Sequence, residues 1–189
     1  MKVLFISLLC MLTLGSCRKD DIVAVGRTFS LLNQENKDVR FPDDFRGKPM
    51  VVSFLYTNCP TVCVVTTHRM ALLRTELGDR DDVMFVSISL DPRRDRPGVL
   101  NDFARLRGID TESWQFLTGS IGTIDSLCEG MNVYAQRSFI EKNENGTEYY
   151  TIDHSDVIAI VDRNGVIRER YTGTELDVEK AVAEINELL

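Results

Sequence analysis

Two cysteines and a distant histidine are the residues of this chain whose types and spacing could do chemistry. Cys59 and Cys63 lie in the segment Cys59-Pro-Thr-Val-Cys63, between an apolar run typical of a strand and a segment with helical spacing. A spacing of four residues puts both sulfur atoms on one face of the first helical turn. The unpaired N–H groups and the positive dipole end of a helix N-terminus stabilise thiolates and lower their pKa. Metal binding and disulfide exchange both require thiolates, so the pair could do either.

Alternating strands and helices must position this pair. Nearly continuous apolar runs over 50–56 and 83–90 are typical of strands that are buried on both faces of a sheet. The full expected order is a hairpin within 29–41, a strand at 50–56, a helix at 61–77, a strand at 83–90, a helix from Pro97 to Gly108, a strand at 115–117, a helix at 123–131, strands at 157–161 and 166–171, and a last helix after a capping box at 174–177. Such alternation requires a central sheet covered on both faces.

This order, with a cysteine pair directly after the first long strand, is the layout of a thioredoxin-like domain. We therefore predict an α/β fold with a central mixed sheet flanked by helices, an N-terminal hairpin and a long loop before the penultimate core strand. That loop, over 138–153, is polar and charged and could also be a loose hairpin. A loop of this length in a compact domain is usually functional.

His154 could supply a third ligand, because it lies at the end of this loop. In a thioredoxin-like fold the loop faces the cysteine pair, and thioredoxin oxidoreductases have a cis-proline there. None of the five prolines of this chain lies beyond Pro97, so none can take that place. Two soft thiolates and one imidazole select copper(I), which accepts three ligands, or with less specificity zinc. Each of these residues also has an interpretation in which it has no functional role. The cysteines could form a structural disulfide or be a buried pair of small apolar residues, and His154 could be a loop histidine with a local hydrogen bond.

Three other residues have simpler interpretations. His68 follows Cys63 by five residues, about 140° around a helix of 3.6 residues per turn, and is expected on the surface. Cys128 has apolar neighbours at helical spacing and is expected to be a buried structural thiol. Asp153 could orient His154 or be a solvated loop carboxylate. The aspartates of the segment 91–97 are expected to be turn and cap residues.

The N-terminus predicts export. In residues 1–17, Lys2 precedes an apolar run that is too short for a membrane span of about 20 residues, which is typical of a secretory signal peptide. Its end, Leu14-Gly-Ser-Cys17, resembles a bacterial lipobox, in which Cys17 is lipidated and becomes the mature N-terminus. The alternative is a plain cleaved signal with an incidental cysteine. We assign residues 18–26 to a tether and 27–189 to the thioredoxin-like domain.

The charge and the cysteine count of the chain limit its possible binding partners and disulfides. The chain has 189 residues and a formal net charge of −7, and an acidic surface repels phosphate backbones, so we expect no nucleic-acid partner. After export and lipidation the folded domain keeps Cys59, Cys63 and Cys128. An odd number of cysteines in an oxidising compartment allows at most one internal disulfide, which would be Cys59–Cys63 in the oxidised pair.

Four stretches together resemble the Sco/SenC family of copper-binding, thioredoxin-fold proteins. They are Tyr56-Thr-Asn-Cys-Pro-Thr-Val-Cys63, Ser89-Leu-Asp-Pro-Arg-Arg-Asp-Arg-Pro97, Trp114-Gln-Phe-Leu-Thr-Gly119 and Asp153-His-Ser-Asp-Val-Ile-Ala-Ile-Val-Asp-Arg-Asn-Gly165. The resemblance implies that Cys59, Cys63 and His154 are copper ligands. Family members often have Asp where Thr61 stands and Pro where Val64 stands. The lost acidic group could weaken copper(II) binding more than copper(I) binding.

Two functions follow from the resemblance. The first is a copper metallochaperone, anchored by lipid on the periplasmic side of a bacterial cell envelope, that delivers copper to the binuclear copper centre of a respiratory oxidase subunit. The second is a thiol–disulfide reductase, with Cys59 as nucleophile and Cys63 as resolving thiol, that acts on cysteines of the oxidase or of other envelope proteins. The two overlap, because copper(I) binding needs the reduced pair.

Overall fold

The computed structural model describes residues 25–78 and 80–189, and its main body is one mixed sheet in the strand order β2-β1-β5-β4-β3-β8-β9. The strands are β1 (Phe29–Asn33), β2 (Asp38–Phe41), β3 (Met50–Leu55), β4 (Met84–Ser89), β5 (Trp114–Thr118), β6 (Ala135–Lys142), β7 (Glu148–His154), β8 (Val157–Val161) and β9 (Ile167–Thr172). The α-helices are α1 (Val62–Leu77), α2 (Pro97–Leu106), α3 (Ile121–Gly130) and α4 (Val178–Glu187), and short 3₁₀ turns are η1 (Asp43–Phe45) and η2 (Gly173–Glu175).

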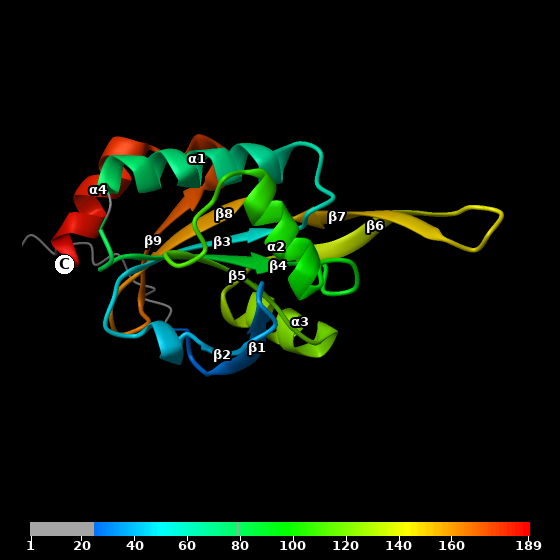
Figure 1. Ribbon diagram of the computed structural model, residues 1–189, viewed down its shortest axis with the longest axis horizontal. Helices are drawn as coiled ribbons and strands as arrows, with labels where there is room; N and C mark the ends of the chain where they lie inside the picture. The colour runs from blue at the N-terminus through cyan, green and yellow to red at the C-terminus, as the bar shows by residue number, and fades with distance from the viewer. Residues whose placement is uncertain (1–24, 79) are drawn as a thin grey trace, which may run out of the picture.

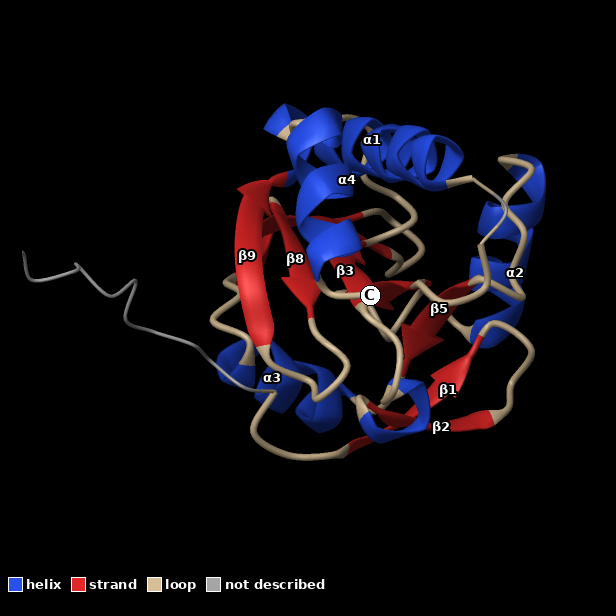
Figure 2. Ribbon diagram, turned by 90° about the vertical axis from the view of Figure 1, so that its left-hand side faces the viewer, coloured by secondary structure: helices blue, strands red, loops and turns tan. Residues whose placement is uncertain are grey.

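The predicted α/β architecture is confirmed. Strands β3, β4 and β5 are parallel, and β8 pairs antiparallel with β3. Helices α1 and α4 lie together on one face of the sheet, and α3 lies on the opposite face (Figures 1 and 2). Because helices cover both faces, all six residues of β3 are buried, which explains the unbroken apolar run in the sequence.

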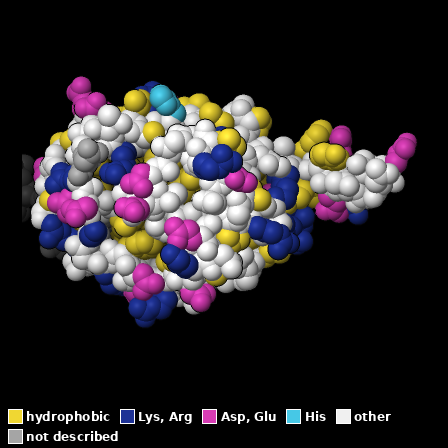
Figure 3. All heavy atoms as spheres, viewed as in Figure 1, with side chains coloured by type: hydrophobic (Ala, Val, Ile, Leu, Met, Phe, Trp, Pro, Cys, Tyr) yellow, Lys and Arg dark blue, Asp and Glu magenta, His cyan; other side chains and the backbone are white. Residues whose placement is uncertain are grey.

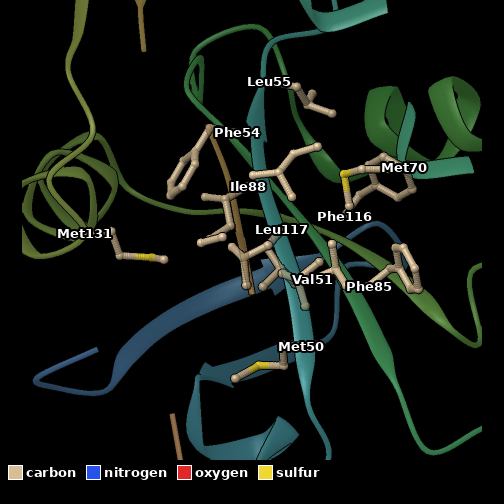
Figure 4. Packing of buried hydrophobic residues seen from close by; sticks show 14 of the residues in the cluster. Met50, Val51, Phe54, Leu55, Met70, Phe85, Ile88, Phe116, Leu117 and Met131 are labelled. Atoms are coloured by element: carbon tan, nitrogen blue, oxygen red, sulfur yellow. The ribbon is translucent and has the colours of Figure 1, made fainter. Parts of the chain in front are cut away.

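The core lies on both sides of the central strands. Val51 and Leu117 have no exposed surface and pack among the other buried side chains in Figure 4. Met70 of α1 lies on one side of this layer, and Met131, directly after α3, lies on the other (Figure 4). The packed sheet gives the loops at the carboxyl end of β3 a rigid base.

The segment predicted as a long loop or loose hairpin is a two-stranded hairpin, the second of these alternatives. Strands β6 and β7 pair from Ala135↔His154 outward to Lys142↔Glu148, with an irregularity between Ser138 and Glu141. We call this hairpin, residues 135–154, the arm; it projects from the body in Figures 1 and 3. The side chains of β6 are almost all exposed and show no apolar alternation, and in β7 only Tyr150 and Ile152 are buried, which is too short a pattern to mark a strand pair in the sequence.

The start of the last helix differs from the prediction. Residues of the expected capping box form η2 instead, and Asp177 is the N-cap of α4, where its carboxylate accepts a hydrogen bond from Lys180 N at 3.0 Å. The backbone and hydroxyl of Thr174, the expected cap, donate to Asp156. From the sequence, either Thr174 or Asp177 could be the N-cap of this helix. Because Thr174 is hydrogen-bonded to Asp156, Asp177 takes the N-cap position.

The predicted signal peptide, Cys17 and most of the predicted tether lie outside the described residues. Val25 belongs to that tether in our assignment, yet its side chain is buried and its N–H donates to Gly165 O at 3.0 Å. The folded part therefore includes Val25. Within the described ranges, no helix has the length and apolar character needed to cross a membrane.

Candidate metal centre

The loop between β3 and α1 delivers both cysteines to one place. Cys59 lies in this loop, and Cys63 lies in the first turn of α1, where its N–H donates to Cys59 Sγ at 3.4 Å. Cys59 is 8% exposed and Cys63 only 2%. Both are free thiols, the form that can bind a metal after deprotonation. The disulfide between them remains a prediction.

His154 reaches this pair from the end of the arm. Its Nε2 lies 3.6 Å from Cys63 Sγ, and its Nδ1 lies 2.9 Å from the carbonyl oxygen of Ser155. A carbonyl can only accept, so Nδ1 carries the proton and Nε2 offers its lone pair toward the sulfur atoms. The ring of Tyr56 meets the imidazole edge-on, with centroids 5.7 Å apart and an angle of 89°.

These three residues form the one His, Cys, Asp or Glu cluster of metal-binding geometry among residues 25–78 and 80–189. The ligand atoms of Cys59, Cys63 and His154 all lie within 4.8 Å of one another. The sequence predicts this set, and the fold brings His154 to Cys63, which lies 91 positions earlier in the chain. Two sulfur atoms and one imidazole nitrogen are a donor set suited to copper(I), which accepts few, soft ligands.

The two thiols have opposite electrostatic surroundings. Burial alone would raise the pKa of Cys59, but hydrogen bonds from the N–H groups of Cys63 and Thr61 and from the Cys63 side chain lower it to about 7. Burial raises the pKa of Cys63 far above its usual value, and the adjacent Cys59 thiolate raises it further. At neutral pH the site therefore holds one partly ionised thiol and one protonated thiol.

A buried aspartate that the sequence analysis treated as a turn residue holds the cysteine loop. Asp95 is fully buried and accepts hydrogen bonds from Thr57 N at 3.0 Å, from Thr57 Oγ1 at 2.5 Å and from Ser89 Oγ at 2.7 Å. It thereby joins the segment before Cys59 to the end of β4. The sequence contained an indication of this role, because Asp95 lies in the loop that follows the carboxyl end of β4, and in α/β sheets functional sites form at that edge.

The neighbouring Asp91 holds strand β7 of the arm. Its carboxylate accepts from Tyr150 Oη at 2.7 Å and pairs with the guanidinium of Arg94. Nη1 of Arg94 donates to the carbonyl oxygen of Tyr150 at 3.1 Å, and the guanidinium lies 3.7 Å from the centre of the Tyr150 ring. These contacts fix strand β7 four residues before His154.

The residues with simpler interpretations behave largely as expected. His68 is exposed, and Cys128 is buried, which raises its pKa to about 12. Asp153 is exposed, and the structure gives the orienting hydrogen bond of His154 to Ser155 O. Of the two interpretations of Asp153, the structure therefore supports a solvated loop carboxylate. Thr61 and Val64, where the sequence departs from the common pattern, are both exposed.

Several solved structures are similar to this chain, among them one that contains bound copper. ScoI of Bradyrhizobium japonicum with copper bound is 29% identical, has a TM-score of 0.75, and the match covers 88% of this chain and 100% of that one. A SCO1/SenC family lipoprotein from Bacillus anthracis is 30% identical with a TM-score of 0.74, over 90% of this chain and 98% of that one. BsSco, described as a member of the Sco family of cytochrome c oxidase assembly proteins and as having a disulfide switch, is 25% identical with a TM-score of 0.70, over 88% and 94%.

The family model SCO1/SenC matches residues 18–189, which include every described element of the fold. The same region carries Cys59, Cys63 and His154. The expected thioredoxin-like architecture is thus shared with the solved Sco structures. The chain belongs to the SCO1/SenC family.

Proposed function

We propose that this protein binds copper through Cys59, Cys63 and His154 and passes it to a copper-accepting subunit of a respiratory oxidase. The observation that carries the proposal is the convergence of two thiols and one imidazole within 4.8 Å. The copper bound by the Bradyrhizobium japonicum relative and the oxidase-assembly description of BsSco support it.

The geometry supports a stepwise capture of copper(I). The Cys59 thiolate, with its pKa of about 7, is the first donor available at neutral pH. Copper bound there favours loss of the Cys63 proton, because a positive ion offsets the burial that keeps this thiol neutral. His154 needs no proton loss at Nε2, since its Nδ1–H is directed to Ser155 O. Release to a partner then requires ligand exchange at a site whose thiols are nearly enclosed.

The same proposal includes the anchor. We infer that the signal peptide is cleaved before Cys17 and that Cys17 carries the lipid, which would anchor residues 27–189 on the periplasmic side of the cell envelope. The lipobox-like sequence at 14–17 supports this, as does the lipoprotein description of the Bacillus anthracis relative.

A copper-loading and transfer experiment tests the proposal. The reduced protein is titrated anaerobically with copper(I) against a competing chelator, and the loaded protein is then mixed with a copper-free soluble oxidase domain. We expect one copper per chain, loss of tight binding in Cys59→Ser and Cys63→Ser, and transfer to the acceptor. Cys128→Ser and His68→Ala are matched controls, because each removes the same residue type outside the cluster and should retain binding.

A reductase is the second candidate, favoured by the acidic Cys59 thiol beside a second thiol. The Cys59 thiolate would attack a substrate disulfide and release one substrate thiolate, and Cys63, after losing its proton, would attack Cys59 Sγ to release the second. An external dithiol would have to restore the reduced pair. Turnover of a disulfide substrate by protein that retains no copper would favour this candidate over the first.

A further inference from the structure

Asp156 joins three separate segments next to the copper site. Its Oδ1 accepts a hydrogen bond from Thr66 Oγ1 of α1 at 2.8 Å. Its Oδ2 accepts from both the N–H and the hydroxyl of Thr174 in η2, each at 2.8 Å. The carbonyl oxygen of Asp156 also accepts from Gly173 N at 3.2 Å. Both carboxylate oxygens of this half-buried residue therefore have hydrogen-bond partners, and these partners lie on two other segments.

The two ends of the Asp156–Thr66 bond lie close in sequence to the candidate ligands. Asp156 follows His154 by two residues, and Thr66 follows Cys63 by three, on the same helix. The hydrogen bond therefore ties the backbone that carries the imidazole to the helix that carries the thiol. The distance from Cys63 Sγ to His154 Nε2, 3.6 Å, depends on how these two segments are held together.

Close packing at this junction leaves the carboxylate little freedom. A Cβ atom added to Gly173 would overlap Asp156 Oδ1 and would lie 2.6 Å from Thr66 Cγ2 and 2.8 Å from Thr66 Oγ1. Real Cβ atoms essentially never approach that closely, so only glycine fits this position without a shift. The η2 turn thus closes over the Asp156–Thr66 bond, and the sequence Gly173-Thr174 serves this contact instead of capping α4.

Other contacts hold the same loop less directly. Ser155 N donates to Tyr134 O at 2.9 Å, and Ser155 Oγ accepts from Tyr134 N at 3.0 Å. Both bonds join the loop to the start of the arm, which projects from the body. Asp156 differs from Ser155 because its partner is on the cysteine-bearing helix itself. Of these contacts, the Asp156–Thr66 bond is the one that joins the loop after His154 to the helix that carries Cys63.

We propose that Asp156 is a positioning residue that holds His154 within reach of the Cys59–Cys63 pair and so makes the site a three-ligand site. The inference rests on the proposed copper function, because it concerns the geometry of that site. With the clamp intact the imidazole is placed before the metal arrives. Without it the two thiolates remain a site for near-linear copper(I), whereas copper(II), which needs nitrogen and oxygen donors, loses its nitrogen ligand.

The experiment compares four variants. Asp156→Asn replaces one carboxylate oxygen by an amide that cannot accept, and Thr66→Val removes the hydroxyl with little change in shape. Thr66→Ser restores a hydroxyl and is the rescue variant. Thr75→Val is the matched control, because Thr75 lies on the same helix with its hydroxyl bonded only to Ala71 O. Each full-length folded chain is titrated with copper(I) and with copper(II), and its thermal midpoint is recorded.

Imidazole NMR of the metal-free protein supplies a readout that does not depend on copper. The chain has two histidines, and the exposed His68 serves as the internal reference for His154. We expect the His154 ring in Asp156→Asn and Thr66→Val to lose its fixed position beside Cys63 Sγ and to give the averaged signal of a mobile ring. The His68 signal should not change in any variant.

Wild-type binding is measured first, so that failure of the copper proposal is separate from failure of this inference. We expect copper(II) affinity to fall by about 10- to 100-fold in Asp156→Asn and Thr66→Val, the usual cost of losing a residue that orients a ligand. Copper(I) affinity should change by less than about threefold, since both thiolates remain. Thr66→Ser should recover copper(II) binding, and Thr75→Val should match wild type.

Two results would overturn the inference in a protein that binds copper. One is wild-type copper(II) affinity and an ordered His154 signal in both clamp variants. The other is an equal loss of copper(I) and copper(II) affinity that follows the thermal midpoint, because that would reduce Asp156 to a general contributor to stability. If wild type binds neither ion, the copper proposal itself fails.

Discussion

Copper(I) loading should release a number of protons that depends on pH in a defined way. The pKa of Cys59 is about 7, and burial keeps Cys63 protonated well above neutral pH. At pH 7, loading should therefore release about 1.5 protons, half a proton on average from Cys59 and one from Cys63. At pH 9, Cys59 is already ionised, so the release should fall to about one proton per copper.

The same titration fixes how affinity changes with pH. From pH 7 to pH 9 the Cys63 proton contributes a factor of about 100 and the Cys59 proton a factor of about 2, so copper(I) should bind about 200-fold more tightly at pH 9. The sign is that of any ligand that must lose its proton: higher pH favours the bound state. Calorimetry in buffers with different ionisation enthalpies measures the protons, and chelator competition measures the affinity.

Controls separate the two thiols. At copper(I) concentrations high enough to fill its weakened site, Cys63→Ser should release about half a proton at pH 7 and none at pH 9, because only Cys59 then titrates. Cys128→Ser should match wild type, since burial holds the pKa of Cys128 near 12 and it lies outside the cluster. A release of two protons at every pH from 7 to 9 would refute the acidification of Cys59 by the helix N-terminus. A release near zero would refute a protonated Cys63.

Three further predictions follow. His154→Ala should lose the copper(II) spectrum of wild type but keep copper(I) and still form the Cys59–Cys63 disulfide, because imidazole takes no part in that bond; an unchanged copper(II) spectrum would remove His154 from the ligand set. Alkylation of the metal-free protein should modify Cys59 first, with a rate midpoint near pH 7, and leave Cys63 and Cys128 unmodified in the native fold; mass spectrometry after short labelling checks this, and preferential modification of Cys63 would contradict it. Cys17→Ala should release the protein from membranes or block its maturation, as fractionation would detect; equal solubility of both forms would refute the lipid anchor.

The sequence alone determined the types of the candidate ligands and the order of the elements in the main sheet and its helices. Local signals were sufficient for these, because an apolar run such as the one in β3 reports burial on both faces, and a cysteine pair after such a strand marks a helix N-terminus. The set Cys59, Cys63 and His154 was likewise available from residue types, the absence of a proline near His154 and the resemblance to Sco/SenC proteins.

Only the tertiary structure decided what holds the ligands in place. For the arm the sequence left a long loop and a loose hairpin open, because its side chains are mostly exposed and only Tyr150 and Ile152 show an apolar alternation. Asp95 and Asp91 were expected to be turn or cap residues, and Asp156 was given no role, since their partners at Thr57, Tyr150 and Thr66 are 38, 59 and 90 positions away. Local patterns record whether a side chain is buried. They do not record which distant group completes a buried carboxylate, because that pairing exists only once the sheet has brought the segments together.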